Sequence, residues 1–496
     1  MPVAAPIMLS SSFLGPCLSP LPVPSPLLER RFVRHLSSRG GARCGLREHP
    51  KWSTHPGGCL PSLGHGREFR SSLDLIQVKG RAREVTAQAG ISFLLPALGV
   101  GVFALIMAKV LESKALEIIG GGSALNASLL PKLTELEKPY KPYPLLSNRH
   151  VETIFATYFR SLPKLTYRRE CLTMVDGGTV ALDWPQPEVQ DPKAVLILLP
   201  GLTGGSDDSY VQHFAQRARS KGWAVVVFNS RGCAEAPVTT PQIQSALFTD
   251  DMGQVVKHIA SMFPSLRVYA TGWSVGANIL VRYLGQEGES CPLSGAVSLC
   301  NVFDLEISSE DFHKGFCRVY NLALAKGLLE MYTKNAHLFK DAGKDFNFPL
   351  IENAKTIREF DDGLTRVVFG HKSVDEYYFK ASSCRSIKDV RVPLLCVQAL
   401  TDPIAPERAI PRADCEANPN CLLVITPYGG HLGWVAGPEA PFGCPWTDPL
   451  AMQYLEALEE AATDSPGFSQ AQEDDGGVEL ASVSTRKSTE KPGLME

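Results

Sequence analysis

The sequence predicts an α/β protein with a mostly parallel, doubly wound sheet and an inserted helical cap. Short, continuous apolar segments alternate with helix-forming segments, and this alternation stops between residues 303 and 388, where helix-prone sequence takes over. Continuously apolar strands are typical of parallel sheets that helices cover on both faces. The expected strands are 194–199, 223–229, 267–272, 294–300, 393–399 and 421–426, and the expected helices lie near 209–221, 247–262, 275–285 and 447–461.

Two further strands are expected ahead of this alternation. The segments YRRECLTM and TVALDWP have strand-like composition, and Asp176-Gly177-Gly178 stands between them as a hairpin turn signal. Together with the alternating region they define a domain over residues 148–461, with the cap at about 303–388.

The first 90 residues do not have the pattern of a folded domain. Residues 1–28 carry no charge, and between Glu29 and Glu84 there are twelve Lys or Arg against five acidic residues. A basic, serine-rich leader resembles an organelle transit peptide. A plain disordered extension is the alternative.

Residues 91–108 form an uncharged segment of eighteen residues, ISFLLPALGVGVFALIMA. That length can just cross a hydrocarbon core as a helix, so 91–111 is predicted to be a single-pass membrane anchor, in a chloroplast or an endoplasmic reticulum or other endomembrane. A buried or interfacial helix is the alternative. Residues 112–147 are interpreted as a Gly- and Pro-rich linker, and 462–496 as an acidic, disordered tail.

The composition of the 496 residues excludes several classes of function. A net charge of −3 gives no general attraction to nucleic acid, so no nucleic-acid partner is expected. The 13 cysteines include no C-x-x-C pair and no metal-ligand spacing. Neither a P-loop nor a G-x-G-x-x-G signature follows the first central strand, and no cofactor or metal is expected. The oligomeric state is not indicated.

The strongest motif is Gly272-Trp273-Ser274-Val275-Gly276, which lies between an apolar strand and a helix-forming segment. A G-x-S-x-G in this position is typical of a nucleophile elbow, a sharp turn that exposes the serine hydroxyl above the sheet. The helix that begins behind the serine favours negative charge at its start. Ser274 is therefore the candidate nucleophile.

The two groups that activate a serine are expected in loops at the carboxyl ends of neighbouring strands. Asp402 follows the strand PLLCVQA, and Pro403 after it keeps that turn from becoming helix. His431 follows the strand CLLVIT through a Tyr-Gly-Gly turn. Each would be an ordinary loop residue by itself, but the chain order Ser, Asp, His and the three strand ends together indicate a catalytic triad.

An oxyanion hole needs two backbone N–H groups that point at the developing negative charge. Val275, directly after the nucleophile, is expected to supply one. The other should come from the loop Pro200–Gly205, in which Leu202 is the best candidate. A plain glycine-rich turn is the alternative interpretation of that loop.

Other conspicuous residues have simpler explanations. Loop and helix N-cap roles explain residues 229–232 and 250–251. His150 is expected to be structural, while Trp273 and Trp434 either line an apolar pocket or pack in the core.

The segments NRHVETIF, LPGLTGGS, FNSRGC, GWSVGANILVRYLG, LTDPIAP and GGHLGW, between Asn148 and Trp434, resemble the AB-hydrolase-4 group. This group includes plant embryogenesis-associated proteins similar to EMB8, bacterial YheT-type esterases and animal ABHD1/ABHD3-type lipases. The resemblance implies an α/β-hydrolase fold, with Ser274 as the nucleophile, Asp402 as the acid and His431 as the base. It covers about three fifths of the chain. The long leader before Ile91 is not part of the family pattern, and with the likeness to plant proteins it favours a chloroplast address.

The function implied is that of a serine hydrolase, a carboxylesterase or acylglycerol lipase that cleaves acylglycerols, phospholipids or short-chain acyl esters. The predicted anchor favours lipid substrates, and a soluble esterase for small esters is a second possibility. A third hypothesis, from another class, is a catalytically inactive hydrolase-fold protein that binds lipid or another ligand as a receptor or scaffold. Such proteins usually lack a triad residue.

Overall fold

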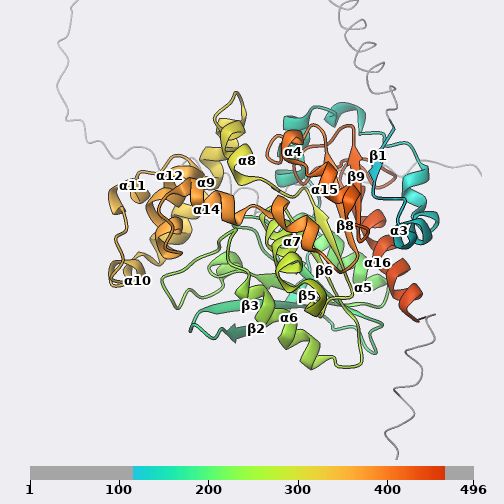
Figure 1. Cartoon of the computed structure of the whole chain (residues 1–496), viewed down its shortest axis with the longest axis horizontal. Helices are drawn as coiled ribbons and strands as arrows, with labels where there is room; N and C mark the ends of the chain where they lie inside the picture. Colours follow the sequence, from blue (N-terminus) through green and yellow to red (C-terminus); the bar gives the residue numbers. More distant parts are fainter. Residues whose placement is uncertain (1–114, 464–496) are drawn as a thin grey trace, which may run out of the picture. The chain divides into compact units, whose positions relative to one another are not determined.

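The computed structural model describes residues 115–463, which form a central β-sheet with helices on both faces (Figure 1). All the expected strands are present, and each of their ends lies within one residue of the end predicted from the sequence. The strands are β1 Glu117–Ile119, β2 Thr166–Thr173, β3 Thr179–Gln186, β4 Val195–Leu199, β5 Ala224–Asn229, β6 Val268–Trp273, β7 Gly295–Leu299, β8 Leu394–Ala399 and β9 Cys421–Thr426. The six strands of the parallel region are fully buried, as strands covered on both faces should be, whereas the edge strand β2 is largely exposed.

The strand order is β1-β9-β8-β7-β6-β4-β5-β3-β2. The six strands from β5 through β4, β6, β7 and β8 to β9 run parallel, as the sequence predicts. At one edge the hairpin of β2 and β3, with its turn at 176–178, pairs antiparallel with β5. At the other edge β1 pairs antiparallel with β9. The parallel strands bring the loops after β6, β8 and β9 to the same edge of the sheet.

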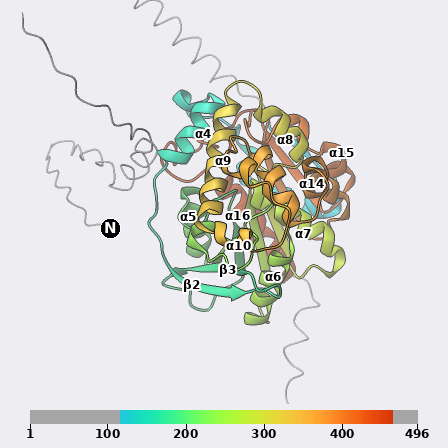
Figure 2. The ribbon, with the colours of Figure 1, turned by 90° about the vertical axis from the view of Figure 1, so that its left-hand side faces the viewer.

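Helices follow most strands of the parallel region and lie on both sides of the sheet (Figure 2). The four helices expected between and after the strands all form. The α-helices of the described part are α3 Ala124–Leu129, α4 Arg149–Tyr158, α5 Ser209–Ser220, α6 Asp250–Met262, α7 Val275–Glu287, α8 Leu305–Phe312, α9 Cys317–Lys334, α10 Ala336–Lys340, α11 Phe348–Glu352, α12 Ile357–Phe360, α13 Arg366–Val368, α14 Val374–Ala381, α15 Arg412–Ala417 and α16 Thr447–Thr463.

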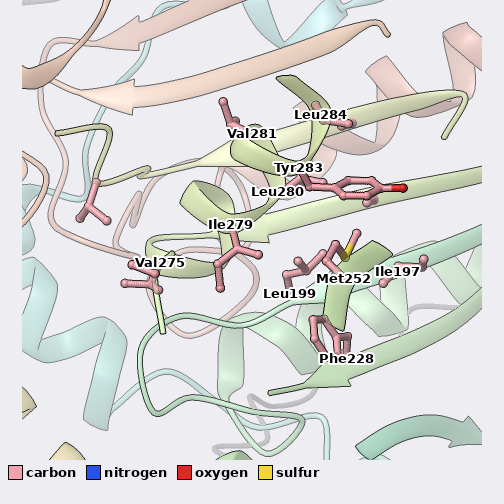
Figure 3. Packing of buried hydrophobic residues seen from close by; sticks show 14 of the residues in the cluster. Ile197, Leu199, Phe228, Met252, Val275, Ile279, Leu280, Val281, Tyr283 and Leu284 are labelled. Carbon is pink, nitrogen blue, oxygen red and sulfur yellow. The ribbon is translucent and has the colours of Figure 1, made fainter. Parts of the chain in front are cut away.

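Alternate residues of each central strand belong to two different hydrophobic cores. In β4, Leu196 and Leu198 pack with α5 and α16, whereas Ile197 and Leu199 pack with α6 and α7. Figure 3 shows the second core, where side chains of α7 such as Ile279 lie close to those of the strands. The two cores fix the sheet between its helical layers and hold the start of α7 behind the end of β6.

Residues 305–381 contain the helices α8 to α14, in the segment where the sequence predicts an inserted helical cap. These helices gather beside the sheet (Figure 1). Those from α9 to α12 share a smaller hydrophobic core, which includes Leu328, Tyr332, Phe339 and Phe360, whereas α8 and α14 pack into the main core, with α6 and α7. A role for this segment as a cap over the site stays a prediction.

The interpretation of residues 112–147 as a linker is wrong for the described residues 115–147. They contain β1, which extends the sheet, and α3, whose buried Asn126 donates hydrogen bonds to the backbone oxygens of Gly120 and Cys421. A strand of three residues, followed at once by glycines, is too short to show a period of two, so the sequence gives no signal for it.

The predicted leader 1–90, the predicted anchor 91–111 and nearly all of the predicted tail 462–496 lie outside the described residues. Among residues 115–463, the structure has no helix that is both long and apolar enough to cross a bilayer.

Candidate active site

Ser274 lies at the sharp turn between β6 and α7. Its φ is +55° and its ψ is −120°, a backbone conformation that residues with a side chain rarely adopt. Its N–H donates to the Leu299 oxygen of β7 at 3.0 Å, and its carbonyl accepts the Asn278 N–H at 3.0 Å as the first bond of the helix. The turn is therefore held by the neighbouring strand on one side and by the helix on the other.

The two glycines of the motif are required by close packing of the backbone. A Cβ on Gly276 would lie 2.2 Å from the Leu199 oxygen and 2.4 Å from the Pro200 oxygen. A Cβ on Gly272 would lie 2.7 Å from the Gly276 oxygen. Only glycine fits at either position, because real Cβ atoms do not come within 3.0 Å of such backbone atoms.

The structure brings Ser274, His431 and Asp402 together, although they come from three loops that follow β6, β9 and β8. The Nε2 of His431 lies 2.9 Å from the Ser274 Oγ. The Nδ1 of the same ring lies 2.9 Å from Oδ2 and 3.1 Å from Oδ1 of Asp402. All three side chains are buried.

Asp402 itself is held by backbone donors. Its Oδ1 accepts the N–H groups of Ile404 at 2.8 Å and Ala405 at 2.9 Å, in a turn that closes on the carboxylate. A carboxylate at this position favours the proton of His431 on Nδ1, which leaves the lone pair of Nε2 directed at the serine hydroxyl. The arrangement can accept a proton from the serine as the hydroxyl attacks an electrophile.

The loop of residues 200–205 passes directly beside the serine. A Cβ on Gly201 would lie 3.4 Å from the Ser274 Cβ. The Gly201 N–H donates to the Tyr210 hydroxyl at 3.0 Å, and the Thr203 N–H donates to the Gln244 Oε1 at 2.7 Å. Between them, the N–H of Leu202 donates to no acceptor within residues 115–463.

The N–H of Val275, the first residue of α7, is likewise without an acceptor in the described part of the chain. The two amides predicted for the oxyanion hole are thus available as donors, and they belong to the two loops that lie side by side at Ser274. Their role in binding an oxyanion stays a prediction.

Helix α4 supplies a group of residues that the sequence analysis does not identify as part of the site. The Thr153 Oγ1 accepts the N–H of His431 at 2.9 Å, and Glu152 Oε1 accepts the N–H of Val435 at 2.7 Å. Arg160, two residues after the helix, donates to the backbone oxygens of Leu432 and Gly433. These three side chains bind backbone groups of residues 431–435, in the loop that carries His431. We call residues 427–435 the histidine loop.

The backbone of this histidine loop needs such support. Leu432 has a φ of +57° and Trp434 a φ of +45°, both strained for residues with side chains. A Cβ on Gly430 would lie 2.6 Å from the Thr153 N and Oγ1 atoms, so the loop packs tightly on α4. The segment NRHVETIF, which carries part of the family resemblance, was the available signal for this role.

The charged side chains behind the histidine loop are buried, and burial shifts their pKa values. Burial raises the pKa of Glu152 to about 7, even though the N–H groups of Val435 and Gly430 act in the opposite direction. Burial also raises the pKa of Asp448 to about 8, and it lowers the pKa of the nearby Arg160 guanidinium. Two buried carboxyl groups with raised pKa values therefore lie behind the histidine loop.

Other residues singled out from the sequence lie away from the triad. Arg231 is buried and pairs with Asp251 at 2.6 Å and with Asp176 at 2.8 Å, tying α6 to the β2–β3 turn. The N-cap interpretation of Asp250 and Asp251 is wrong, because Thr249 occupies that position and the Asp251 carboxylate binds Arg231 instead.

The other ring-bearing residues singled out from the sequence pack against or bind neighbouring side chains. The Trp273 indole packs between the rings of Tyr210 and Phe214, and Trp434 donates its Nε1–H to the Thr426 hydroxyl at 2.9 Å. His150 is in contact with Tyr320, whose hydroxyl lies 3.2 Å from its Nδ1.

Comparison with known proteins agrees with this architecture. Residues 194–438 match the alpha/beta hydrolase fold family. The chain is 58% identical to the embryogenesis-associated protein EMB8 of Picea glauca over 71% of this chain and 78% of that protein. It is 32% identical to the phospholipase ABHD3 of Mus musculus, over 70% of this chain and 85% of the relative. It is 30% identical to a monoacylglycerol lipase of Saccharomyces cerevisiae, over 59% of this chain and 75% of that lipase.

The fold and the residues of the site are those of an α/β hydrolase. The chain belongs to the alpha/beta hydrolase family, in the AB-hydrolase-4 group of EMB8 and ABHD3, and is an enzyme of the esterase and lipase type. The resemblance predicted from the sequence motifs is confirmed.

Proposed function

We propose that this enzyme hydrolyses carboxylic esters of lipids, acylglycerols or phospholipids, through a covalent acyl-enzyme on Ser274. The observation that supports the proposal is the continuous hydrogen-bond chain from the Ser274 Oγ through the His431 ring to Asp402, with 2.9 Å at each step. In such a chain, the imidazole can take the serine proton while the carboxylate stabilises the resulting imidazolium.

In the proposed reaction the Ser274 Oγ attacks the ester carbonyl carbon, and His431 Nε2 accepts the hydroxyl proton. The N–H groups of Val275 and Leu202 donate to the oxyanion of the tetrahedral intermediate. His431 then gives its proton to the departing alcohol, which leaves the acyl group on Ser274. A water molecule, deprotonated by His431, then attacks the acyl carbon. The bond from that carbon to the Ser274 Oγ breaks, His431 returns the proton to Oγ, and the fatty acid is released.

The lipid preference draws on the relatives, one named a phospholipase and another a monoacylglycerol lipase. Acyl-chain profiling distinguishes a lipase from an esterase for short acyl esters. In a lipid-binding site each additional buried methylene adds roughly 0.8 kcal/mol, so kcat/KM rises about fourfold per methylene until the site is full. A flat or falling profile would contradict the lipid assignment and leave the ester hydrolysis intact.

The nucleophile is tested with a fluorophosphonate probe on the full chain. Ser274→Ala should lose all labelling and lower ester hydrolysis about 10⁴-fold or more. Ser261→Ala, at an exposed serine of α6, is the matched control and should keep both. Labelling that persists in Ser274→Ala would refute the assignment of the nucleophile.

A membrane location is proposed from the uncharged segment 91–108 alone. Extraction of cell membranes with alkaline carbonate, on the full chain and on a chain without 91–108, tests it. The full chain should stay in the pellet and the shortened chain should move to the supernatant. A plastid address is tested separately by imaging a fusion that carries residues 1–90.

A further inference from the structure

An exposed apolar face lies beside the active site, on α4, the first half of α9 and the loop before α16. Large apolar side chains at Val151, Phe159, Phe316, Val319, Leu322 and Phe442 are each 45–56% exposed. We call this set the apolar face. Isolated exposed apolar residues are ordinary, but a group of large ones on adjacent elements indicates an interaction surface.

Direct contacts connect the parts of this face. The His150 ring of α4 lies 4.8 Å, centroid to centroid, from the ring of Phe316 at the start of α9. At the other end of α4, the Phe155 ring lies 5.9 Å from Phe159 and 5.5 Å from Phe442. Helices α4 and α9 lie near each other in Figure 2 as well.

The charges around the apolar face are almost all positive. Between Arg149 and Arg169 the sole acidic residue is the buried Glu152, and residues 312–329 contain none. Arg149, Lys164 and Arg318 are exposed in these two stretches, and Lys314 is exposed as well but pairs with Asp311. This combination of helices with exposed apolar side chains and cations is typical of binding to an anionic lipid surface.

The acidic residues at the border of the face are already paired. Asp311 binds Lys314 at 2.7 Å and Arg408 at 2.9 Å, and Glu439, near Phe442, binds Arg217 at 2.7 Å. They therefore offer little repulsion to lipid phosphates.

The face adjoins the catalytic residues through both helices. Thr153 of α4 accepts the N–H of His431, and Cys317 of α9 donates to the oxygen of Pro403, the residue after Asp402. A cavity of about 420 Å³ lies between Arg149 and Phe316 and reaches Asp402. A bilayer that covers the apolar face would thus lie next to the site at which lipid esters are cleaved.

We propose that the apolar face docks the enzyme onto an anionic phospholipid surface and presents the active site to lipids in that surface. The inference rests on the proposed function for the identity of the substrate. It concerns residues of the hydrolase domain itself and does not depend on the anchor predicted at 91–111. The basic stretch between Glu29 and Glu84 of this chain is a poor occupant, because its twelve cations would face the cations of α4 and α9.

The first test compares two matched double variants of the full chain. Val319→Ser/Leu322→Ser removes two exposed apolar residues of the face, and Val175→Ser/Met262→Ser removes two exposed apolar residues from the β2–β3 turn and the end of α6. Hydrolysis is measured on phospholipid in vesicles of phosphatidylcholine with phosphatidylglycerol, and on p-nitrophenyl butyrate in solution.

We expect the face variant to lose about tenfold or more of its rate on vesicle lipid, because two side chains no longer leave water on docking. Its rate on the soluble ester should equal that of the native enzyme, and the control variant should keep both rates. Arg318→Gln should weaken the preference for vesicles with phosphatidylglycerol over phosphatidylcholine alone, most clearly at low salt. An unchanged vesicle rate in the face variant, or an equal loss on both substrates, would overturn the proposal.

A second measurement tests docking without turnover and without interference from an anchor. Leu322→Trp places an indole on the face, and Val175→Trp places one on the control surface. Phospholipids brominated on the acyl chain should quench the added fluorescence of Leu322→Trp and not that of Val175→Trp. Equal quenching in both, or none in either, contradicts the proposal even if the chain hydrolyses no ester.

Absence of quenching together with a dimer in sedimentation would instead assign the face to a second copy of this chain. If the native chain hydrolyses no soluble ester, the proposed function is wrong, but the result of the docking measurement still holds.

Discussion

The loop that carries Ser274 and the loop that carries His431 are stabilised in different ways. The turn at Ser274 is fixed by its own glycines and by the strands on either side, β4 and β7, whose backbone atoms it touches. The histidine loop depends on side chains of α4 and Arg160, more than 270 positions earlier in the sequence. The nucleophile is therefore held by backbone packing, while the base is held by hydrogen bonds that single substitutions can remove without filling or crowding the core.

The largest effect is expected at the serine turn. In Gly276→Ala the new Cβ would lie 2.2 Å from the Leu199 oxygen, so β4 and α7 must separate. We expect a loss of about 3 kcal/mol or more in the free energy of unfolding, with loss of activity.

The matched control is Gly253→Ala, a glycine inside α6 whose new Cβ would meet a single atom at an ordinary distance of 3.5 Å. That change should stabilise by up to about 1 kcal/mol, since alanine favours helix more than glycine does. Urea unfolding measures both. Equal stability of the two variants would show that the turn is not fixed by backbone packing.

An intermediate effect, dependent on pH, is expected behind the histidine loop. The pKa of Glu152 is about 7 in the folded protein and near 4.5 without burial, so the folded state binds more protons in this range. Stability should therefore fall as pH rises from about 4.5 to about 7, and the contribution of this one group is roughly 3 kcal/mol.

Glu152→Gln should reduce that decline, measured by urea unfolding at pH 5 and pH 8. Asp448, with a pKa of about 8, contributes in the same direction, so Asp448→Asn in addition should flatten the dependence further. An undiminished decline in both variants would show that these buried carboxyl groups do not govern the stability around the loop.

The smallest effect is expected at Thr153. Thr153→Val removes the acceptor for the His431 N–H, a loss of about 1 kcal/mol, which corresponds to about fivefold in kcat/KM on a soluble ester. Thr153→Ser keeps the hydroxyl and should restore the rate. If Ser impairs the enzyme as much as Val does, the methyl packing of Thr153, rather than its hydrogen bond, supports the base.

Much of the sheet could be predicted because its strands are long enough to show their pattern. β4, β6 and β8 are five or six residues long, carry no charged residue and end in glycine- or proline-containing turns, which marks both their type and their ends. β1 has three residues and was missed for that reason. The role of Asp251 was misassigned, because its partner Arg231 lies 20 residues away and on another element.

The order of the strands along the chain, the turn at Ser274, and the strand ends at which Asp402 and His431 lie could all be predicted from the residues alone. Backbone conformation and periodicity depend on residues that are close in the sequence, so these features can be predicted without a structure. That α4 supports the histidine loop, and that α4 and α9 share one exposed face, becomes visible in the folded chain. Such contacts depend on where the chain returns in space, and a single sequence carries no local signal for the partner of a buried side chain.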